Sequence, residues 1–303
     1  MPSISTSPGE VAHVDACTDV HYVDTGMYDT PGYGAVYVVD AERPAVLDTG
    51  IGTHHERVLD ALDEVGIARE DLGAIVVSHV HLDHAGGAGF LAEACPNAEV
   101  YVNEMGVPHL ADPSRLVAGT KAAVGDMWTH YVEPKPVPEE RMTALAGGDT
   151  VDLGDRGVDV VSVPGHAPHQ VAFHDRREDA LFVADAAGIY VPSHEGVRQT
   201  SPPPNFDLEQ CLHDVETLQA REPSVLCYPR RYEGEMLDEY SRVLSGWVET
   251  IGDVREELDD DEAVVDYFVE RDGMASVWGE EKARGEAAMN VRGVLGYLDR
   301  TAE

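Results

Sequence analysis

The sequence has very little positive charge. Only 21 of its 303 residues are lysine or arginine, against 57 aspartate and glutamate, and the formal net charge is −36. Three residues are lysine: Lys121, Lys135 and Lys282. A chain so short of cations repels polyanions, which argues against nucleic acid and anionic membrane surfaces as partners.

The excess of acid has two interpretations, adaptation to high salt or an acidic surface for a partner. The acidic residues are spread along the whole chain, which favours high salt, where charges are screened strongly. We therefore predict that the protein needs molar salt to stay folded, because screening removes its self-repulsion. Thermal melts at low and at molar KCl test this, and a melting temperature that does not rise with salt would contradict it.

Cysteine is also scarce, with four in the chain. None forms a Cys-X-X-Cys pair, and their spacing gives no dense disulfide framework. We expect Cys17, Cys95, Cys211 and Cys227 to be reduced, mostly packing residues of a cytoplasmic protein.

Long apolar runs are absent as well. No stretch approaches the ~20 residues that span a bilayer. Met1–Glu10 shows neither the basic nor the apolar segment of a signal peptide, and we expect a loose tail there. These absences predict a cytoplasmic protein that does not enter a membrane.

The pattern of apolar residues predicts a layered α/β fold. Two blocks of short apolar strands, at residues 20–103 and 150–184, are interleaved with or followed by helical segments. A connection rich in proline and acid at residues 129–140 lies between the blocks. Two such blocks indicate two sheets packed face to face, with helices outside them.

The last third of the chain changes character. A loop is expected at Tyr190–Asn205, which carries four prolines, and Asp207 is a plausible cap for the helix that follows. From Glu235 onward the periodicity is helical, with breaks near Asp259 and Gly273. The predicted domains are residues 11–234, rich in strands, and a helical extension, residues 235–303, packed on it.

One short stretch concentrates side chains that bind metal. His79, His81, Asp83 and His84 fall within six residues, directly after Leu72–Ser78, an apolar run typical of a buried strand. In an extended strand end the first two histidines point the same way, and three following glycines are expected to let the backbone turn. So dense a group indicates a metal or catalytic site rather than a general abundance of histidine.

The pattern His-X-His-X-Asp-His after a buried strand resembles the signature of the metallo-β-lactamase superfamily. The resemblance covers residues of about 40–235 and implies the four-layer αββα sandwich of that family, here with extra C-terminal helices. It also implies that one strand end supplies ligands to two adjacent metal ions.

Further motifs support the same resemblance. In the family, the residue that matches Asp48 braces the metal loop by hydrogen bonds, and the one that matches His166 is a metal ligand. The residue that matches Asp185 bridges two metals. His169 and His174 are expected behind the ligands or on the surface.

The last motif departs from the family pattern. Where a histidine usually completes the second metal site, this chain has Arg230 and Arg231. An arginine stays charged and cannot bind a metal. Either the arginines point away, or the second site is weakened, or His194 or His213 substitutes. The candidate substrate contacts are Arg230, Arg231 and Tyr190.

The resemblance implies a metal-dependent hydrolase acting on a small molecule. Zinc held by His79, His81 and His166 would lower the pKa of a water from ~15.7 to about 7, and Asp83 would orient that water and take its proton. One zinc ion is expected, and a second is left open. The nearest branches are glyoxalase II and the lactonases, which implies cleavage of a thioester, a lactone or another carboxylic ester.

Other activities are left open by the sequence. A persulfide dioxygenase of the same superfamily would hold one iron ion through His79, His166 and Asp185. A nuclease would bring basic strips or an inserted domain, and neither is seen. The missing histidine is also consistent with a non-catalytic metal-binding scaffold. A homodimer is not excluded.

Overall fold

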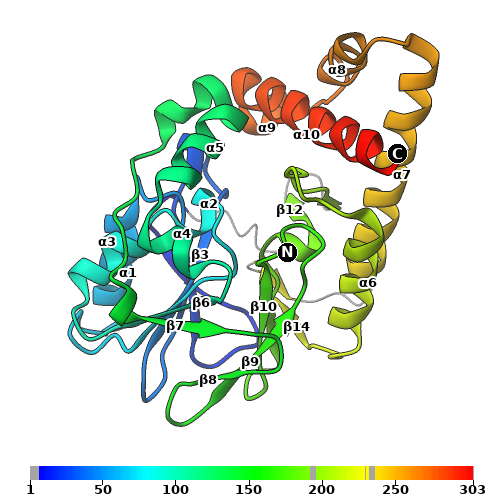
Figure 1. The fold of residues 1–303 in the computed structure, drawn as a ribbon. Coiled ribbons are helices and arrows are strands. Elements are labelled where there is room, and N and C mark those ends of the chain that lie inside the picture. Colours follow the sequence, from blue (N-terminus) through cyan, green and yellow to red (C-terminus); the bar gives the residue numbers. More distant parts are fainter. Residues whose placement is uncertain (1–6, 192–195, 229, 232–235, 303) are drawn as a thin grey trace. The chain divides into compact units, whose positions relative to one another are not determined.

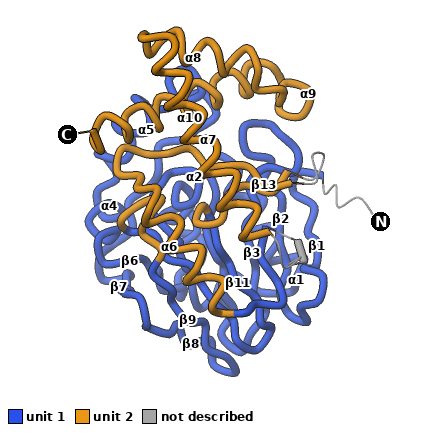
Figure 2. Tube along the Cα trace, turned by 90° about the vertical axis from the view of Figure 1, so that its right-hand side faces the viewer, with its two compact units in different colours: residues 1–162, 169–184, 222–232 blue, residues 163–168, 185–221, 233–303 orange. Residues whose placement is uncertain are grey.

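The computed structural model describes residues 7–191, 196–228, 230–231 and 236–302. Contacts within the chain define two compact units, which Figure 2 colours separately. Unit 1 comprises residues 1–162, 169–184 and 222–232, and unit 2 comprises residues 163–168, 185–221 and 233–303. The domain boundaries 11–234 and 235–303 stay a prediction.

Unit 1 contains a seven-stranded sheet whose strands lie side by side in sequence order (Figure 1). The first four strands pair antiparallel through short connections. The later strands pair parallel, because a helical crossover separates each from the next. The strands are β1 Val11–His13, β2 Val20–Asp24, β3 Ala35–Val39, β4 Ala45–Leu47, β5 Ala74–Val76, β6 Glu99–Asn103 and β7 Met142–Leu145.

Five α-helices of unit 1 provide the crossovers. The first buries Val58, Leu59 and Leu62 and ends at Gly66, whose left-handed backbone favours glycine. Its N-cap residue is His54, and the preceding Thr53 hydroxyl donates to the His130 carbonyl. The helices are α1 His55–Val65, α2 Leu82–Ala85, α3 Ala88–Ala94, α4 Val107–Ala111 and α5 Ser114–Val124, with short 3-10 turns η1 Met27–Asp29, η2 Gly125–His130 and η3 Glu139–Arg141.

A second, six-stranded sheet completes unit 1, in the order β15-β14-β11-β10-β9-β8. Its pairs are antiparallel except β11 with β14, which are parallel. The strands are β8 Thr150–Asp152, β9 Gly157–Ser162, β10 Val171–Asp175, β11 Ala180–Phe182, β14 Val225–Leu226 and β15 Arg230–Arg231.

Alternating side chains of the first sheet build two cores. In β3, Val36 and Val38 belong to a core shared with α1 and α3. Tyr37 and Val39 belong to a second core shared with the other sheet, where the Tyr37 ring lies 5.1 Å from the ring of Phe182. The two sheets therefore face each other with helices outside the first, which confirms the predicted sandwich.

Unit 2 is mainly helical. The Asp207 carboxylate accepts a hydrogen bond from the Gln210 backbone at 3.0 Å and caps its first helix, as predicted. The helical C-terminal region and its two breaks are also confirmed. The helices are α6 Leu208–Gln219, α7 Met236–Leu258, α8 Asp261–Val269, α9 Ala275–Trp278 and α10 Glu280–Thr301.

The loop expected at Tyr190–Asn205 is wrong in part. A small hairpin pairs β12, Ile189–Val191, with β13, Gly196–Arg198. Each strand has three residues, too few to show a periodicity, and the prolines around them dominated the sequence pattern. A 3-10 turn, η4 Ala184–Ala187, precedes the hairpin.

The cysteines and the helices bear on two of the expectations from the sequence, reduced thiols and no membrane span. All four cysteines are buried and none forms a disulfide. Within the part of the chain that the structure describes, no helix is both long and apolar enough to cross a membrane.

Candidate metal centre

Three histidines of unit 1 meet just beyond the end of β5. The backbone stays irregular from Val77 to His81 and then enters the short helix α2. His79 is fully buried, and its ring centre lies 4.6 Å from that of His81 and 4.3 Å from that of His84. The turn into α2 thus brings the imidazole of His84 close to the cluster that His79 and His81 begin.

Asp48, at the end of β4, holds this loop in place. Its carboxylate accepts hydrogen bonds from the Ser78 backbone N–H at 2.8 Å and from the Ser78 hydroxyl at 2.9 Å. The same carboxylate lies 2.8 Å from Nδ1 of His84. Asp48 has a φ of 57°, a left-handed backbone that costs about 1–2 kcal/mol for a residue other than glycine. The strained backbone therefore lies at the residue whose carboxylate holds the histidine loop.

The bond from Asp48 decides the tautomer of His84. A carboxylate only accepts, so Nδ1 of His84 carries a proton, and Nε2 is the nitrogen that a metal ion could bind. That Nε2 lies 3.7 Å from the Asp83 carboxylate. A histidine whose far nitrogen is fixed by a carboxylate is the usual arrangement behind a metal site. The donor set of unit 1 therefore fits a divalent metal ion.

The glycines after the cluster act by close packing rather than by turning the chain. Gly86 and Gly87 have ordinary helical backbone angles. A Cβ on Gly86 would collide with the backbone oxygen of Ile51, and one on Gly87 with that of Thr49. The sequence-based reason for these two glycines was therefore wrong, and they allow the metal loop to lie against the segment after β4.

An aromatic group of unit 1 reaches the same loop. The hydroxyl groups of Tyr28 and Tyr131 are hydrogen-bonded. Burial, then Tyr131, then the charge of Asp83 raise the pKa of Tyr28 well above its usual value. Tyr28 and Asp29 both have left-handed backbone angles, which the surrounding loop must hold. Sequence reasoning missed this pair, although Tyr28 lies in the glycine- and proline-rich loop after β2.

Unit 2 brings together two other predicted ligands, His166 and Asp185. Nε2 of the buried His166 lies 3.3 Å from the Asp185 carboxylate. The Thr200 hydroxyl is 3.4 Å from Nδ1 of His166 and donates to the Asp185 carbonyl at 3.4 Å. The loop that carries His166 is held by α6, because the Gly165 N–H donates to the Asp214 carboxylate at 2.6 Å.

Other histidines lie away from these groups or behind them. His169 is in unit 1, with its ring centre 5.6 Å from that of His81. Burial, assisted by His81 and His109, lowers the pKa of His169 to about 4 and keeps it neutral at pH 7. His174 is buried and pairs with Asp179, while His213 is exposed on α6 beside Glu216.

The remaining predicted contacts are only partly described. Tyr190 lies in β12 and is half-buried. Arg230 and Arg231 form β15, but their side chains lie outside the described residues, as does all of His194. Whether an arginine occupies the place of the missing histidine stays a prediction.

Residues 29–230 match the model of the metallo-beta-lactamase superfamily. The chain belongs to this superfamily. Its fold implies binding of a divalent metal ion, in agreement with the histidine and carboxylate groups of each unit. The family resemblance predicted from the motifs around Asp48, His79 and Asp185 is confirmed.

Several curated relatives are similar to the chain at low identity. A metallo-beta-lactamase fold-containing protein, ST1585, of Sulfurisphaera tokodaii is 25% identical over 69% of this chain and 77% of its own. An acyl-coenzyme A thioesterase of Gallus gallus is 29% identical over 57% of this chain, and an N-acyl homoserine lactonase of Bacillus thuringiensis is 26% identical over 55%. The matches span 65% of the thioesterase and 58% of the lactonase.

Solved structures support the fold. The crystal structure of an archaeal superfamily protein from Sulfolobus tokodaii has a TM-score of 0.71 at 21% identity, covering 92% of this chain and 99% of that one. A subclass B3 metallo-beta-lactamase of Bradyrhizobium japonicum has a TM-score of 0.60 at 19% identity, covering 84% and 97%. The predicted fold class, a metallo-β-lactamase-type α/β sandwich with extra C-terminal helices, is confirmed.

Proposed function

We propose that this protein is a metal-dependent hydrolase that cleaves a thioester, a lactone or another carboxylic ester. The observation that carries the proposal is the histidine loop held by Asp48, because it presents a fixed tautomer and a carboxylate side by side. The thioesterase and lactonase among the relatives support the two leading substrate classes.

We assign His79, His81 and His166 to one ion, zinc by preference, and Asp83 and His84 to a second, with Asp185 in the bridging role that the family resemblance implies. Occupancy of the second position stays a prediction.

A divalent ion held there would supply a Lewis acid and a water of lowered pKa. We assign the proton transfer to Asp83. Its carboxylate accepts a proton from the attacking water and returns it to the thiolate or alkoxide that leaves when the C–S or C–O bond breaks, which gives the free thiol or alcohol. The position of its neighbour His84 is kept by Asp48, and the half-buried Tyr28 adds a polar hydroxyl near Asp83.

The test pairs metal analysis with a substrate screen. The protein purified in molar KCl should contain zinc and should hydrolyse acyl-coenzyme A thioesters or N-acyl homoserine lactones. Loss of turnover with chelator and recovery with zinc are expected. Bound iron with oxygen uptake on a persulfide would favour the dioxygenase instead. Bound metal without turnover on any ester, thioester or lactone would favour a non-catalytic scaffold.

A further inference from the structure

A pocket of about 260 Å³ lies within unit 2, between β13 and the helices α7, α8 and α10. None of the predicted site residues whose side chains the structure describes lines it. Its wall combines apolar and aromatic side chains with two arginines and one aspartate. The lining residues are Arg198, Gln199, Val243, Trp247, Phe268, Arg271, Asp272, Ala287, Asn290 and Val291.

The charges in this pocket are unusual for the chain. Two cations and one anion line it, in a protein whose formal net charge is −36. Arg198 pairs with Asp272 at 2.8 Å, so this pair is locally neutral. Arg271 is half exposed, lies over the Tyr267 ring, donates to the Tyr267 carbonyl at 2.8 Å and lies 3.7 Å from the exposed Glu270 carboxylate. A guanidinium has five donors, so Arg271 can still bind an anion.

The apolar part of the wall favours a ligand whose central part is apolar. Trp247 and Val243 come from α7, Phe268 from α8 and Val291 from α10. Pockets that bind small molecules are largely apolar, with a few polar groups that fix orientation. This pocket is at the small end of that class. It therefore suits a short apolar chain that carries one anionic group.

A short segment connects the pocket to the predicted ligands of unit 2. Arg198 and Gln199 line the pocket, and the next residue, Thr200, contacts Nδ1 of His166 and donates to the Asp185 carbonyl. The hydroxyl of Ser201 donates to Asn290 on the pocket wall. Two residues of extended chain span about 7 Å. The pocket is therefore one short acyl chain away from His166.

We infer that this pocket binds the far end of the substrate's acyl group and that this end carries a carboxylate. The inference rests on the proposed function, because it places the reacting carbonyl beside His166 and Asp185. The apolar walls hold the methylene chain, and Arg271 binds the terminal carboxylate. The preferred substrate is then a thioester or ester of a dicarboxylic acid.

The experiment compares adipoyl-coenzyme A with hexanoyl-coenzyme A, whose acyl chains have equal length and differ in the terminal carboxylate. We expect kcat/KM to be about tenfold or more higher for the adipoyl substrate, the value of one charge-assisted hydrogen bond. Arg271→Gln should abolish this preference, so that kcat/KM for the adipoyl substrate falls to that for the hexanoyl substrate. Arg292→Gln is the matched control and should keep the preference, since Arg292 is an exposed residue of α10 that pairs with Glu262 of α8 and does not line the pocket.

Calorimetric titration of the full-length protein with adipate and with hexanoate gives a second readout that needs no turnover. Adipate should bind more tightly, and Arg271→Gln should remove the difference. Equal kcat/KM values, or a preference that survives in Arg271→Gln, would overturn the inference. Adipate binding through Arg271 without thioester hydrolysis would support the pocket and reject the proposed function. Neither binding nor hydrolysis would reject both.

Discussion

Replacing His81 with alanine should remove most of the bound metal and most of the hydrolytic activity. Alanine has no donor atom, and the imidazole it replaces lies 4.6 Å from that of His79. Loss of a residue behind a metal ligand typically costs about 10- to 100-fold in affinity or activity, so loss of a ligand should exceed about 100-fold. Metal content by mass spectrometry and kcat/KM on the best substrate measure the effect.

Asp48→Asn provides an intermediate case. Both carboxylate oxygens of Asp48 meet donors, from Ser78 and from His84. An amide keeps only one accepting oxygen, so one of these donors would face an NH₂ group. A loss of about 10- to 100-fold in metal affinity or activity is expected.

The control for both variants is His13→Ala, at an exposed histidine of β1, which should change neither metal content nor activity. Unchanged metal content in His81→Ala would disprove the assignment of the histidine loop as a metal site.

The sequence alone predicted most of what places the site. Short apolar strands end at Leu47 and Val76, and the residues that follow them carry Asp48 and the histidine cluster. Since neighbouring parallel strands end at the same edge of a sheet, the two groups had to lie close together, as they do. Local patterns of this kind need no knowledge of distant residues.

Contacts between distant segments could not be predicted in this way. The hydrogen bond between Tyr28 and Tyr131 joins residues 103 positions apart, and the contact of Thr200 with His166 joins residues 34 apart. No periodicity or motif encodes such pairs. The close approach at Gly86 was missed for the same reason, because the colliding oxygen of Ile51 comes from another element. The salt requirement and the cytoplasmic location stay predictions.

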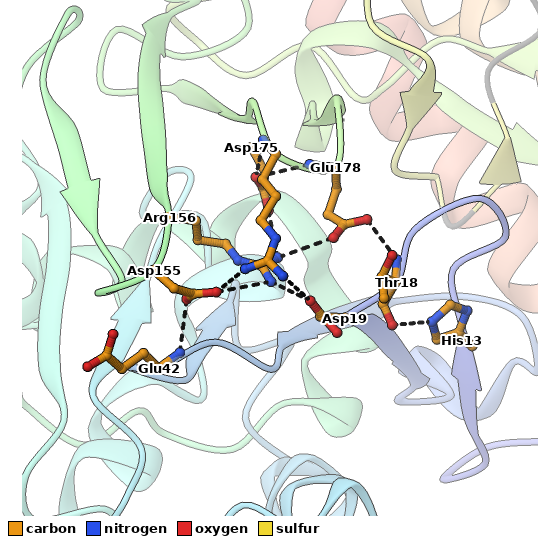
Figure 3. A network of polar contacts seen from close by, with 9 residues as sticks. His13, Thr18, Asp19, Glu42, Asp155, Arg156, Asp175 and Glu178 are labelled. Carbon is orange, nitrogen blue, oxygen red and sulfur yellow. Dashed lines mark hydrogen bonds and ion pairs between the residues drawn. The ribbon is translucent and has the colours of Figure 1, made fainter.

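A buried arginine gives the largest expected effect on stability. Arg156 lies in the turn between β8 and β9, and its side chain is 1% exposed. Figure 3 shows its polar contacts. Arg156 donates to Asp175 at 3.1 Å and to Asp19 at 2.6 Å, and it lies 3.7 Å from Glu178. Burial alone would lower the pKa of Arg156, but the bonds to Asp19 and Asp175 outweigh it and raise the pKa.

This group of charges joins three separate parts of unit 1. Asp19 lies before β2, Arg156 lies before β9, Asp175 is the last residue of β10, and Glu178 lies between β10 and β11. Glu178 also accepts a hydrogen bond from the Thr18 N–H at 2.7 Å. Because Asp175 is fully buried, its charge depends on the guanidinium for compensation. The arginine therefore holds together acids that would otherwise repel one another.

Arg156→Ala should lower the free energy of unfolding by about 3–5 kcal/mol, since it leaves a buried carboxylate without its partner. Arg177→Ala is the matched control. Arg177 pairs with Asp155 and Asp19, but it is 46% exposed, so its removal should cost less than about 1 kcal/mol. Urea unfolding of both variants in molar KCl measures the difference. Molar salt should further weaken the contribution of Arg177 to the free energy of unfolding. It should leave most of the contribution of Arg156, because buried ion pairs are screened less. Equal losses in the two variants would show that burial of this network does not govern its stability.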